Sequence, residues 1–126
     1  MLSTENNIYI IGSGAIGQAL AVFLKLAGKS VLLIRGSVND GSMNTERLHV
    51  EMEDGTIHEA QLEIGTLVNF PSLNGVIVLT NKSYGNEQLA IALKHKTSCS
   101  PIVLLQNGIG VEKSFINHQY PEIYRC

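Results

Sequence analysis

Charged residues and cysteine are both scarce in this chain of 126 residues. Only 16% of the residues are charged and the formal net charge is −2, so no electrostatic attraction to nucleic acid or to an anionic membrane is expected. The two cysteines, Cys99 and Cys126, lie far apart and form no Cys-x-x-Cys pair. We therefore expect reduced thiols rather than a disulfide framework.

Long hydrophobic runs are also missing. Runs such as Val31–Ile34 and Val76–Leu79 are too short to cross a bilayer. No basic segment followed by an apolar stretch and a small-residue cleavage site opens the chain. The expectation is a cytoplasmic protein without nucleic-acid or membrane partners. Hydrophobic residues make up 44% of the chain, which suits one compact domain over residues 1–126.

The N-terminal third carries the strongest pattern. Asn7–Ile11 is an apolar run rich in β-branched residues, typical of a strand buried on both faces of a parallel sheet. It leads into Gly12–Gly17, a G-x-G-x-x-G, and then into a helical stretch over Gln18–Lys29, with Gly28 near its end. Val31–Ile34 follows as a second strand and completes a β-α-β unit of about 30 residues. The residues recurring at helical spacing, which should face the core, are Ile16, Leu20, Phe23, Leu24 and Ala27.

Each glycine of the motif has a role in a dinucleotide site. Gly12 permits a tight turn, Gly14 lets the backbone approach a pyrophosphate, and Gly17 allows close packing of the helix on the sheet. Free N–H groups and the positive end of the helix dipole then hold the phosphates. The alternative is a glycine-rich turn that only packs. The strand before the motif, and the helix and strand after it, favour the nucleotide site.

The residue after the second strand distinguishes between two cofactors. Sites for NAD usually carry an acidic residue there, which accepts hydrogen bonds from the ribose 2′-OH. Here that position is Arg35, followed by Gly36 and Ser37. A guanidinium matches a 2′-phosphate, and the Ser37 hydroxyl could add a contact. NADP is favoured over NAD, although a solvated surface arginine would give the same sequence.

A hairpin is predicted in the middle of the chain. Val38–Glu46 is polar and indicates a loop, whereas Leu48–Met52 and Thr56–Ile64 are extended segments around an Asp54-Gly55 turn. This hairpin is inserted where a simpler fold would place a helix. His49 and His58 could face each other across it. Two histidines without further ligands make a weak metal site, and we predict surface histidines and no bound metal.

The second half of the chain continues the alternation of strands and helices. Gly75–Thr80 and Pro101–Leu105 are apolar strands, and a helix capped by Asn86 lies between them. Val111–His118 is a short helix, and Glu122–Cys126 begins a further strand. The predicted fold class is α/β: a Rossmann-type, mostly parallel sheet flanked by helices, with an inserted β-hairpin.

Functional residues gather at one edge of this predicted sheet. Gly12–Gly17, Arg35, Lys82 and Asn107 all follow the carboxyl ends of strands. Ligands of open α/β sheets bind at that edge. A binding site built from these four segments is therefore expected.

Four motifs together resemble the N-terminal domain of the ketopantoate reductase family. They are Gly12–Gly17, Arg35 at the strand end, Thr80-Asn81-Lys82, and Leu105–Gly110 with its Asn-Gly-x-Gly. The last motif is the most family-specific, and the resemblance covers nearly the whole chain. It implies an NADPH-dependent enzyme that reduces the 2-oxo acid 2-dehydropantoate to pantoate on the route to pantothenate and coenzyme A.

The resemblance also implies roles for particular residues. Lys82 would lie against the cofactor, and Asn107 would lie near the nicotinamide and contact the substrate. The alternatives are a solvated lysine and a turn residue. Gly85 departs from the family, which often has Gln three places after the lysine. The implied cofactor-binding residues are Gly12, Ser13, Gly14, Ala15, Ile16, Gly17, Arg35, Lys82 and Asn107, the last also binding substrate.

The family pattern places the chemistry outside this chain. Ketopantoate reductases carry a second, helical domain with the catalytic lysine, so no catalytic residue is predicted here. We expect a fragment of a two-domain reductase that binds NADPH without turnover. The alternatives are a non-catalytic NAD(P)-binding regulatory module and a related reductase acting on another 2-oxo acid. Nothing in the sequence indicates an oligomeric state.

Overall fold

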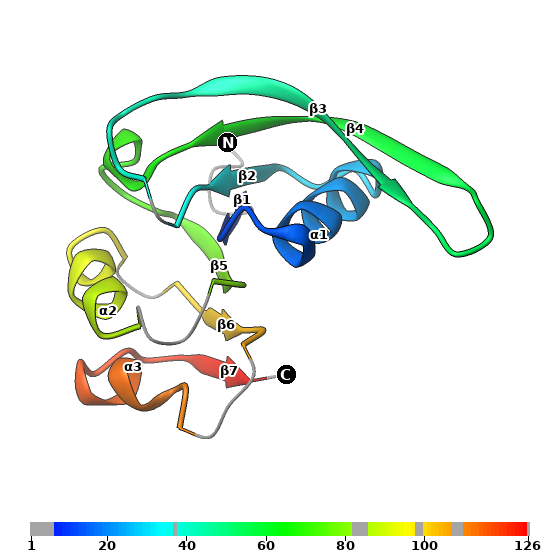
Figure 1. Ribbon diagram of the computed structural model, residues 1–126. Helices are drawn as coiled ribbons and strands as arrows, with labels where there is room; N and C mark the ends of the chain where they lie inside the picture. The colour runs from blue at the N-terminus through cyan, green and yellow to red at the C-terminus, as the bar shows by residue number, and fades with distance from the viewer. Residues whose placement is uncertain (1–6, 37, 82–85, 98–99, 107–109, 126) are drawn as a thin grey trace.

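The structure is a computed structural model that describes residues 7–36, 38–81, 86–97, 100–106 and 110–125 (Figure 1). Strands and helices alternate along it, apart from one hairpin. The strands are β1 (Asn7–Ile11), β2 (Val31–Ile34), β3 (Asn44–Glu51), β4 (Ile57–Gly65), β5 (Gly75–Leu79), β6 (Ile102–Leu104) and β7 (Ile123–Arg125). The helices are α1 (Ala15–Leu26), the 3₁₀ turn η2 (Leu67–Asn69), α2 (Asn86–Lys94) and α3 (Lys113–Asn117).

All these strands form one sheet, in the order β3-β4-β2-β1-β5-β6-β7. β3 pairs with β4 antiparallel, and the other neighbouring pairs of described strands are parallel. The mostly parallel Rossmann-type sheet with an inserted hairpin is therefore confirmed. The hairpin does more than fill a connection, because its second strand, β4, pairs with β2 and extends the parallel sheet.

Helices cover both faces of the sheet (Figure 1). On one face, α1 buries Ala21 and Val22 against Ile10, Leu33 and Leu62. On the other face, α2 and α3 bury a second apolar cluster that includes Ile11, Ile77, Leu93, Leu104 and Phe115. Alternation along β1 and β2 supplies both clusters, which explains why these strands are apolar at nearly every position.

The predicted inward face of α1 was partly wrong. Ile16 is 62% exposed and Phe23 is 38% exposed, whereas the buried residues are Gly17, Ala21 and Val22. The helix begins at Ala15, directly at the glycine loop, so Gly17 is turned toward the sheet and Ala21 follows one turn later. Small residues at the contact allow α1 to lie close to the strands.

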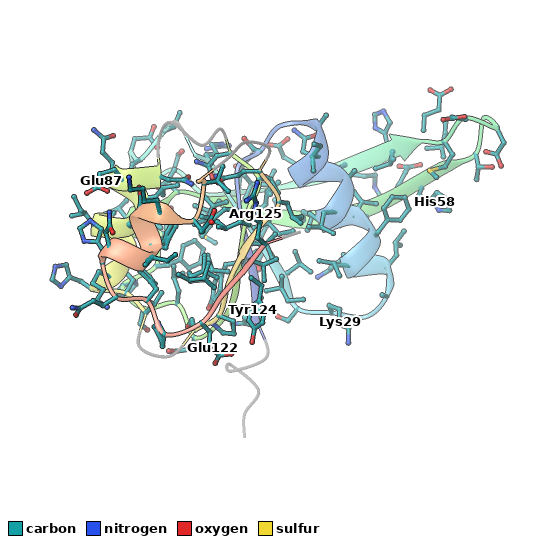
Figure 2. All side chains as sticks on the ribbon, turned by 90° about the horizontal axis from the view of Figure 1, so that it is seen from below. Lys29, His58, Glu87, Glu122, Tyr124 and Arg125 are labelled. Carbon is teal, nitrogen blue, oxygen red and sulfur yellow. The ribbon has the colours of Figure 1, made fainter. Side chains whose placement is uncertain are left out.

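The loop predicted over Val38–Glu46 ends earlier, because β3 already begins at Asn44. The hairpin projects beyond the body of the domain, with His58 on its arm (Figure 2). His49 lies opposite Glu59 and His58 lies opposite Val50. Adjacent residues of a strand point to opposite faces, so the two histidines are on opposite faces of the hairpin. The prediction that they could face each other was wrong, and the His58 ring instead contacts that of Phe23, with centroids 5.5 Å apart.

The described part of the chain contains no helix that is both long and apolar enough to cross a membrane. Within residues 7–36, 38–81, 86–97, 100–106 and 110–125, no three metal-ligating side chains of His, Cys, Asp or Glu come together.

Candidate functional site

The three glycines of the loop between β1 and α1 differ in whether the packing of the protein itself requires them. Gly12 has a φ of +113°, and a Cβ there would lie 2.7 Å from Thr80 Oγ1. A Cβ on Gly17 would overlap the carbonyl oxygen of Gly12. A Cβ on Gly14 would meet no atom within 4 Å, and its φ of −76° is open to any residue. The protein's own packing therefore requires glycine at positions 12 and 17 but leaves open space at position 14.

The start of α1, next to Gly14, has backbone donors that no side chain caps. Gly14 is the N-cap and no side chain caps the helix, so the first N–H groups of the helix lack a partner within it. Two side chains hold the loop in shape. Gln18 Nε2 donates to the Ser13 carbonyl at 2.6 Å. Thr80 Oγ1 lies 3.1 Å from the carbonyl oxygens of both Ile11 and Gly12. Sequence reasoning missed both bracing roles, because neither is visible without the loop conformation.

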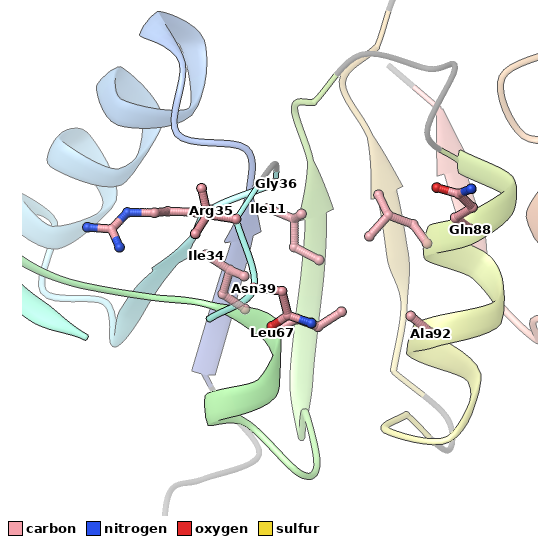
Figure 3. Close-up of a pocket in the computed structure, with 10 residues that line it drawn as sticks. Ile11, Ile34, Arg35, Gly36, Asn39, Leu67, Gln88 and Ala92 are labelled. Atoms are coloured by element: carbon pink, nitrogen blue, oxygen red, sulfur yellow. The ribbon is translucent and has the colours of Figure 1, made fainter. Parts of the chain in front are cut away.

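A pocket of about 200 Å³ opens beside the glycine loop (Figure 3). Its lining is mainly apolar and comes from the ends of β1 and β2, from η2 and from α2. The lining residues are Ile11, Ile34, Arg35, Gly36, Val38, Asn39, Leu67, Gln88, Leu89 and Ala92. Gln88 is a polar side chain in this pocket that sequence reasoning did not single out.

The loop after β2 forms one wall of the pocket and is anchored to η2. Asn39 Oδ1 accepts a hydrogen bond from the Val68 N–H at 2.7 Å. The Gly41 N–H donates to Thr66 Oγ1 at 3.0 Å, and Asn69 Nδ2 donates to the Gly41 carbonyl at 2.9 Å. These bonds fix the wall of the pocket without help from a ligand.

Arg35 lies at the rim, and its guanidinium runs away from the other lining residues (Figure 3). Nη1 donates to Ser42 Oγ at 2.8 Å and Nη2 donates to Asn44 Oδ1 at 3.0 Å. Nη2 also lies 3.9 Å from the Glu46 carboxylate. The side chain is 25% exposed, so this arginine is held by the hairpin rather than free in solvent.

A second carboxylate acts on this region through Ser42. Hydrogen bonds from the side chain and the backbone of Ser42 lower the pKa of Asp40 from its ordinary value, and the charge of Arg35 lowers it further. Asp40 is therefore ionised at neutral pH.

Two predicted binding residues, Lys82 and Asn107, lie outside the described residues, as do Ser37, Gly85 and both cysteines. The described residues beside them form a network of buried amides. Asn86 Nδ2 donates to Gln106 Oε1 at 2.7 Å and to the Val111 carbonyl at 2.9 Å. Gln106 Nε2 donates to Asn86 Oδ1 at 2.9 Å and to Asn81 Oδ1 at 3.2 Å. Asn86 was predicted to cap a helix, but it is the first residue of α2 and its side chain serves this network.

Replacing Gln106 by leucine tests the network. Gln106 is 5% exposed and Asn86 is 3% exposed, so the variant removes the two hydrogen bonds that join these buried amides, including the one accepted by Asn86 Oδ1. We expect the free energy of unfolding to fall by about 1–3 kcal/mol in chemical denaturation. The matched control is Gln61→Leu at an exposed position of β4, expected to change stability by less than about 0.5 kcal/mol. Equal stability of both variants would show that the network contributes nothing.

The residues at this edge fit a dinucleotide. The open space at Gly14 and the uncapped N–H groups of α1 suit a pyrophosphate. The apolar pocket suits a flat base, and the arginine at its rim suits the polar groups of a ribose. Together with the strand order, they define a Rossmann-type α/β domain.

Comparison with known proteins places the chain within this class. The family model described as "Ketopantoate reductase PanE/ApbA" matches residues 8–124. The chain therefore belongs to the ketopantoate reductase family, whose members are pyridine-nucleotide-dependent reductases, and the resemblance noted in the sequence is confirmed.

Individual relatives agree with this placement. The chain is 31% identical over 110 residues to a 2-dehydropantoate 2-reductase of Pyrococcus abyssi, covering 86% of this chain and 35% of that protein. It superposes on the dimeric ketopantoate reductase of Staphylococcus aureus with a TM-score of 0.69 and 16% identity, covering 94% of this chain and 38% of the other. D-mandelate dehydrogenase, solved with NADH and anilino(oxo)acetate, gives a TM-score of 0.72 and 24% identity, covering 94% and 39%. The structural matches show a shared fold, and the chain spans little more than a third of the length of these proteins.

Proposed function

We propose that this chain is the NADPH-binding domain of a two-domain reductase acting on 2-dehydropantoate. The open space at Gly14 is the observation that carries the proposal. Neither packing nor backbone conformation demands glycine there, whereas a pyrophosphate resting on the N-terminus of α1 does. Gly12 and Gly17 shape the loop, and the N–H groups from Ser13 to Gly17 hold the phosphates.

The residues that would hold the adenosine half of the cofactor lie at the end of β2. In the apolar pocket between the loop after β2 and α2, Leu67 and Leu89 would offer apolar surface to the adenine and Gln88 would offer an amide to its polar groups. Arg35 then binds the 2′-phosphate at the rim with charge-assisted hydrogen bonds.

The residues that would hold the nicotinamide half follow the ends of β5 and β6. There Lys82 would bind the cofactor as a point charge, and Asn107 would orient the nicotinamide and contact the substrate, as the family resemblance implies. Asn81 and Gln106, which immediately precede these two residues, are tied to each other at 3.2 Å. That bond supports the proposal because it brings the two segments together at one edge.

When bound, NADPH supplies the hydride that reduces the carbonyl of the 2-oxo acid. The residues of this chain bind the cofactor, orient its ring and exclude water from one side. The proton for the carbonyl oxygen comes from the catalytic lysine of a second, helical domain. The isolated chain accordingly binds NADPH without turnover, and the whole reductase works in the cytoplasm on pantothenate synthesis.

An Arg35→Ala variant tests the cofactor assignment. The substitution removes the guanidinium and its charge-assisted hydrogen bonds to the 2′-phosphate, the one group that distinguishes NADPH from NADH. We expect calorimetric titration to show NADPH binding weakened about tenfold to hundredfold and NADH binding changed by less than about threefold.

The matched control is Arg47→Ala, which removes an arginine of the hairpin that likewise pairs with a carboxylate, that of Glu59 at 3.7 Å. Both affinities should survive that change. Equal losses for the two cofactors in Arg35→Ala would contradict the assignment of Arg35 to the 2′-phosphate.

A further inference from the structure

The guanidinium of Arg35 already has an anionic neighbour within the protein. Glu46 Oε2 lies 3.9 Å from Arg35 Nη2 and accepts a hydrogen bond of 2.6 Å from Asn44 Nδ2. Asn44 in turn accepts from Arg35 at 3.0 Å. The arginine, the amide and the carboxylate thus form a closed set in which Glu46 neutralises the cation that the proposed function assigns to the 2′-phosphate.

The placement of Glu46 follows from the strand register. Asn44 and Glu46 are two positions apart on β3, so their side chains share one face. Asn44 lies opposite Ile64, and Gly65, which follows, accepts the Arg35 N–H at 2.9 Å. The end of β2 and the start of β3 are therefore held together by β4. The carboxylate of Glu46, on this face of β3, therefore lies beside the guanidinium.

We infer that Glu46 is a specificity-determining residue that competes with the 2′-phosphate for Arg35. The inference rests on the proposed function. A phosphomonoester carries between one and two negative charges at neutral pH, so its arrival beside Glu46 brings like charges together. The carboxylate must swing away, and its 45% exposed side chain has solvent into which it can move.

Only NADPH meets this obstacle. NADH carries a neutral 2′-OH, for which a nearby carboxylate is a tolerable or favourable neighbour. Glu46 therefore narrows the preference for NADPH that Arg35 provides. Asp40 contributes less, since it reaches the guanidinium through Ser42 whereas Glu46 faces it directly.

Glu46→Gln is the variant that tests this inference. Glutamine keeps the shape and can still accept from Asn44, while the negative charge is lost. We expect NADPH to bind about threefold to tenfold more tightly, as measured by calorimetry, and NADH to change by less than about twofold. The gain should shrink at about 0.5 M salt, because partly exposed charges are screened.

Two further variants make the test specific. Glu59→Gln alters the net charge equally and removes a similarly exposed carboxylate, 48% against 45%, which pairs with Arg47 instead. It should leave both affinities unchanged. In the Arg35→Ala background, Glu46→Gln should produce none of its gain for NADPH, because the cation through which it acts is missing.

Several outcomes would overturn the inference. Unchanged NADPH affinity in Glu46→Gln shows that the carboxylate does not compete, even where Arg35→Ala confirms the 2′-phosphate site. An equal gain in Glu59→Gln shows a general charge effect. Failure of the unmodified chain to bind either cofactor would contradict the proposed function itself, and this inference with it.

Discussion

A Gly14→Ala variant is expected to fold normally and to lose binding of both NADPH and NADH. The new Cβ meets no atom of the protein within 4 Å and the backbone φ of −76° suits alanine. The cost to stability is that of a poorer N-cap, less than about 1 kcal/mol. The same methyl group occupies the space into which a pyrophosphate would fit, so its hydrogen bonds to the loop N–H groups cannot form.

The expected loss of affinity is about a hundredfold or more, since two or more charge-assisted hydrogen bonds disappear. Calorimetric titration measures it, with thermal unfolding as the check on the fold. Both cofactors should weaken alike, because they share the pyrophosphate, and this distinguishes Gly14→Ala from Arg35→Ala. Retained binding by a folded Gly14→Ala protein would show that no phosphate approaches this loop.

Gly17→Ala should have the opposite profile, with a large loss of stability. Gly17 lies in the first turn of α1, and helix propensity alone predicts that alanine would stabilise the protein by about 1 kcal/mol. Here the added Cβ overlaps the Gly12 carbonyl oxygen and lies 2.8 Å from Thr80 Oγ1. Because the backbone has to move, we expect a cost toward the upper end of the range for overpacking, about 1–3 kcal/mol.

Chemical denaturation of the Gly17→Ala protein shows whether the free energy of unfolding rises, as helix propensity predicts, or falls, as the close contact predicts. A lower free energy of unfolding than that of the unmodified chain supports the close contact between α1 and the glycine loop. An increase of about 1 kcal/mol would mean that propensity dominates and that the contact is looser than the structure has it.

The local parts of this fold could be read from the sequence. Asn7–Ile11 and Val31–Ile34 are strands with the predicted bounds, because buried parallel strands are apolar throughout and glycines mark their ends. Gly28, near the predicted end of α1, has a φ of +87° and its N–H bonds to the Lys25 carbonyl. Such signals depend on neighbours in the chain, which the sequence contains.

Features that depend on distant contacts were missed. The inward face of α1 was misjudged because the glycine loop sets the rotation of the helix, which brings Gly17 and Ala21 inward in place of Ile16. The orientation of His49 and His58 depends on hairpin register, which alternation alone leaves open. The sequence assigned no role to Gln106, yet its side chain joins Asn81 and Asn86 across 25 and 20 positions of sequence.

The candidate site, too, has a part that the sequence predicts and a part that only the folded chain reveals. The glycine motif and Arg35 were visible as a pattern around two strand ends. The partners of Arg35 were not, because Ser42, Asn44 and Glu46 reach it from a loop and from a strand that was predicted to start later. The pocket wall formed by η2 and α2 likewise requires the folded chain.

Calorimetric titration of the unmodified chain with NADPH, and separately with NADH, is the decisive experiment for the cofactor site. We predict that both bind and that NADPH binds at least about tenfold more tightly, a difference of about 1.4 kcal/mol. Tighter binding of NADH would contradict the role of Arg35 at a 2′-phosphate. Binding of neither would contradict the proposed nucleotide site and leave the glycine loop with a purely structural role.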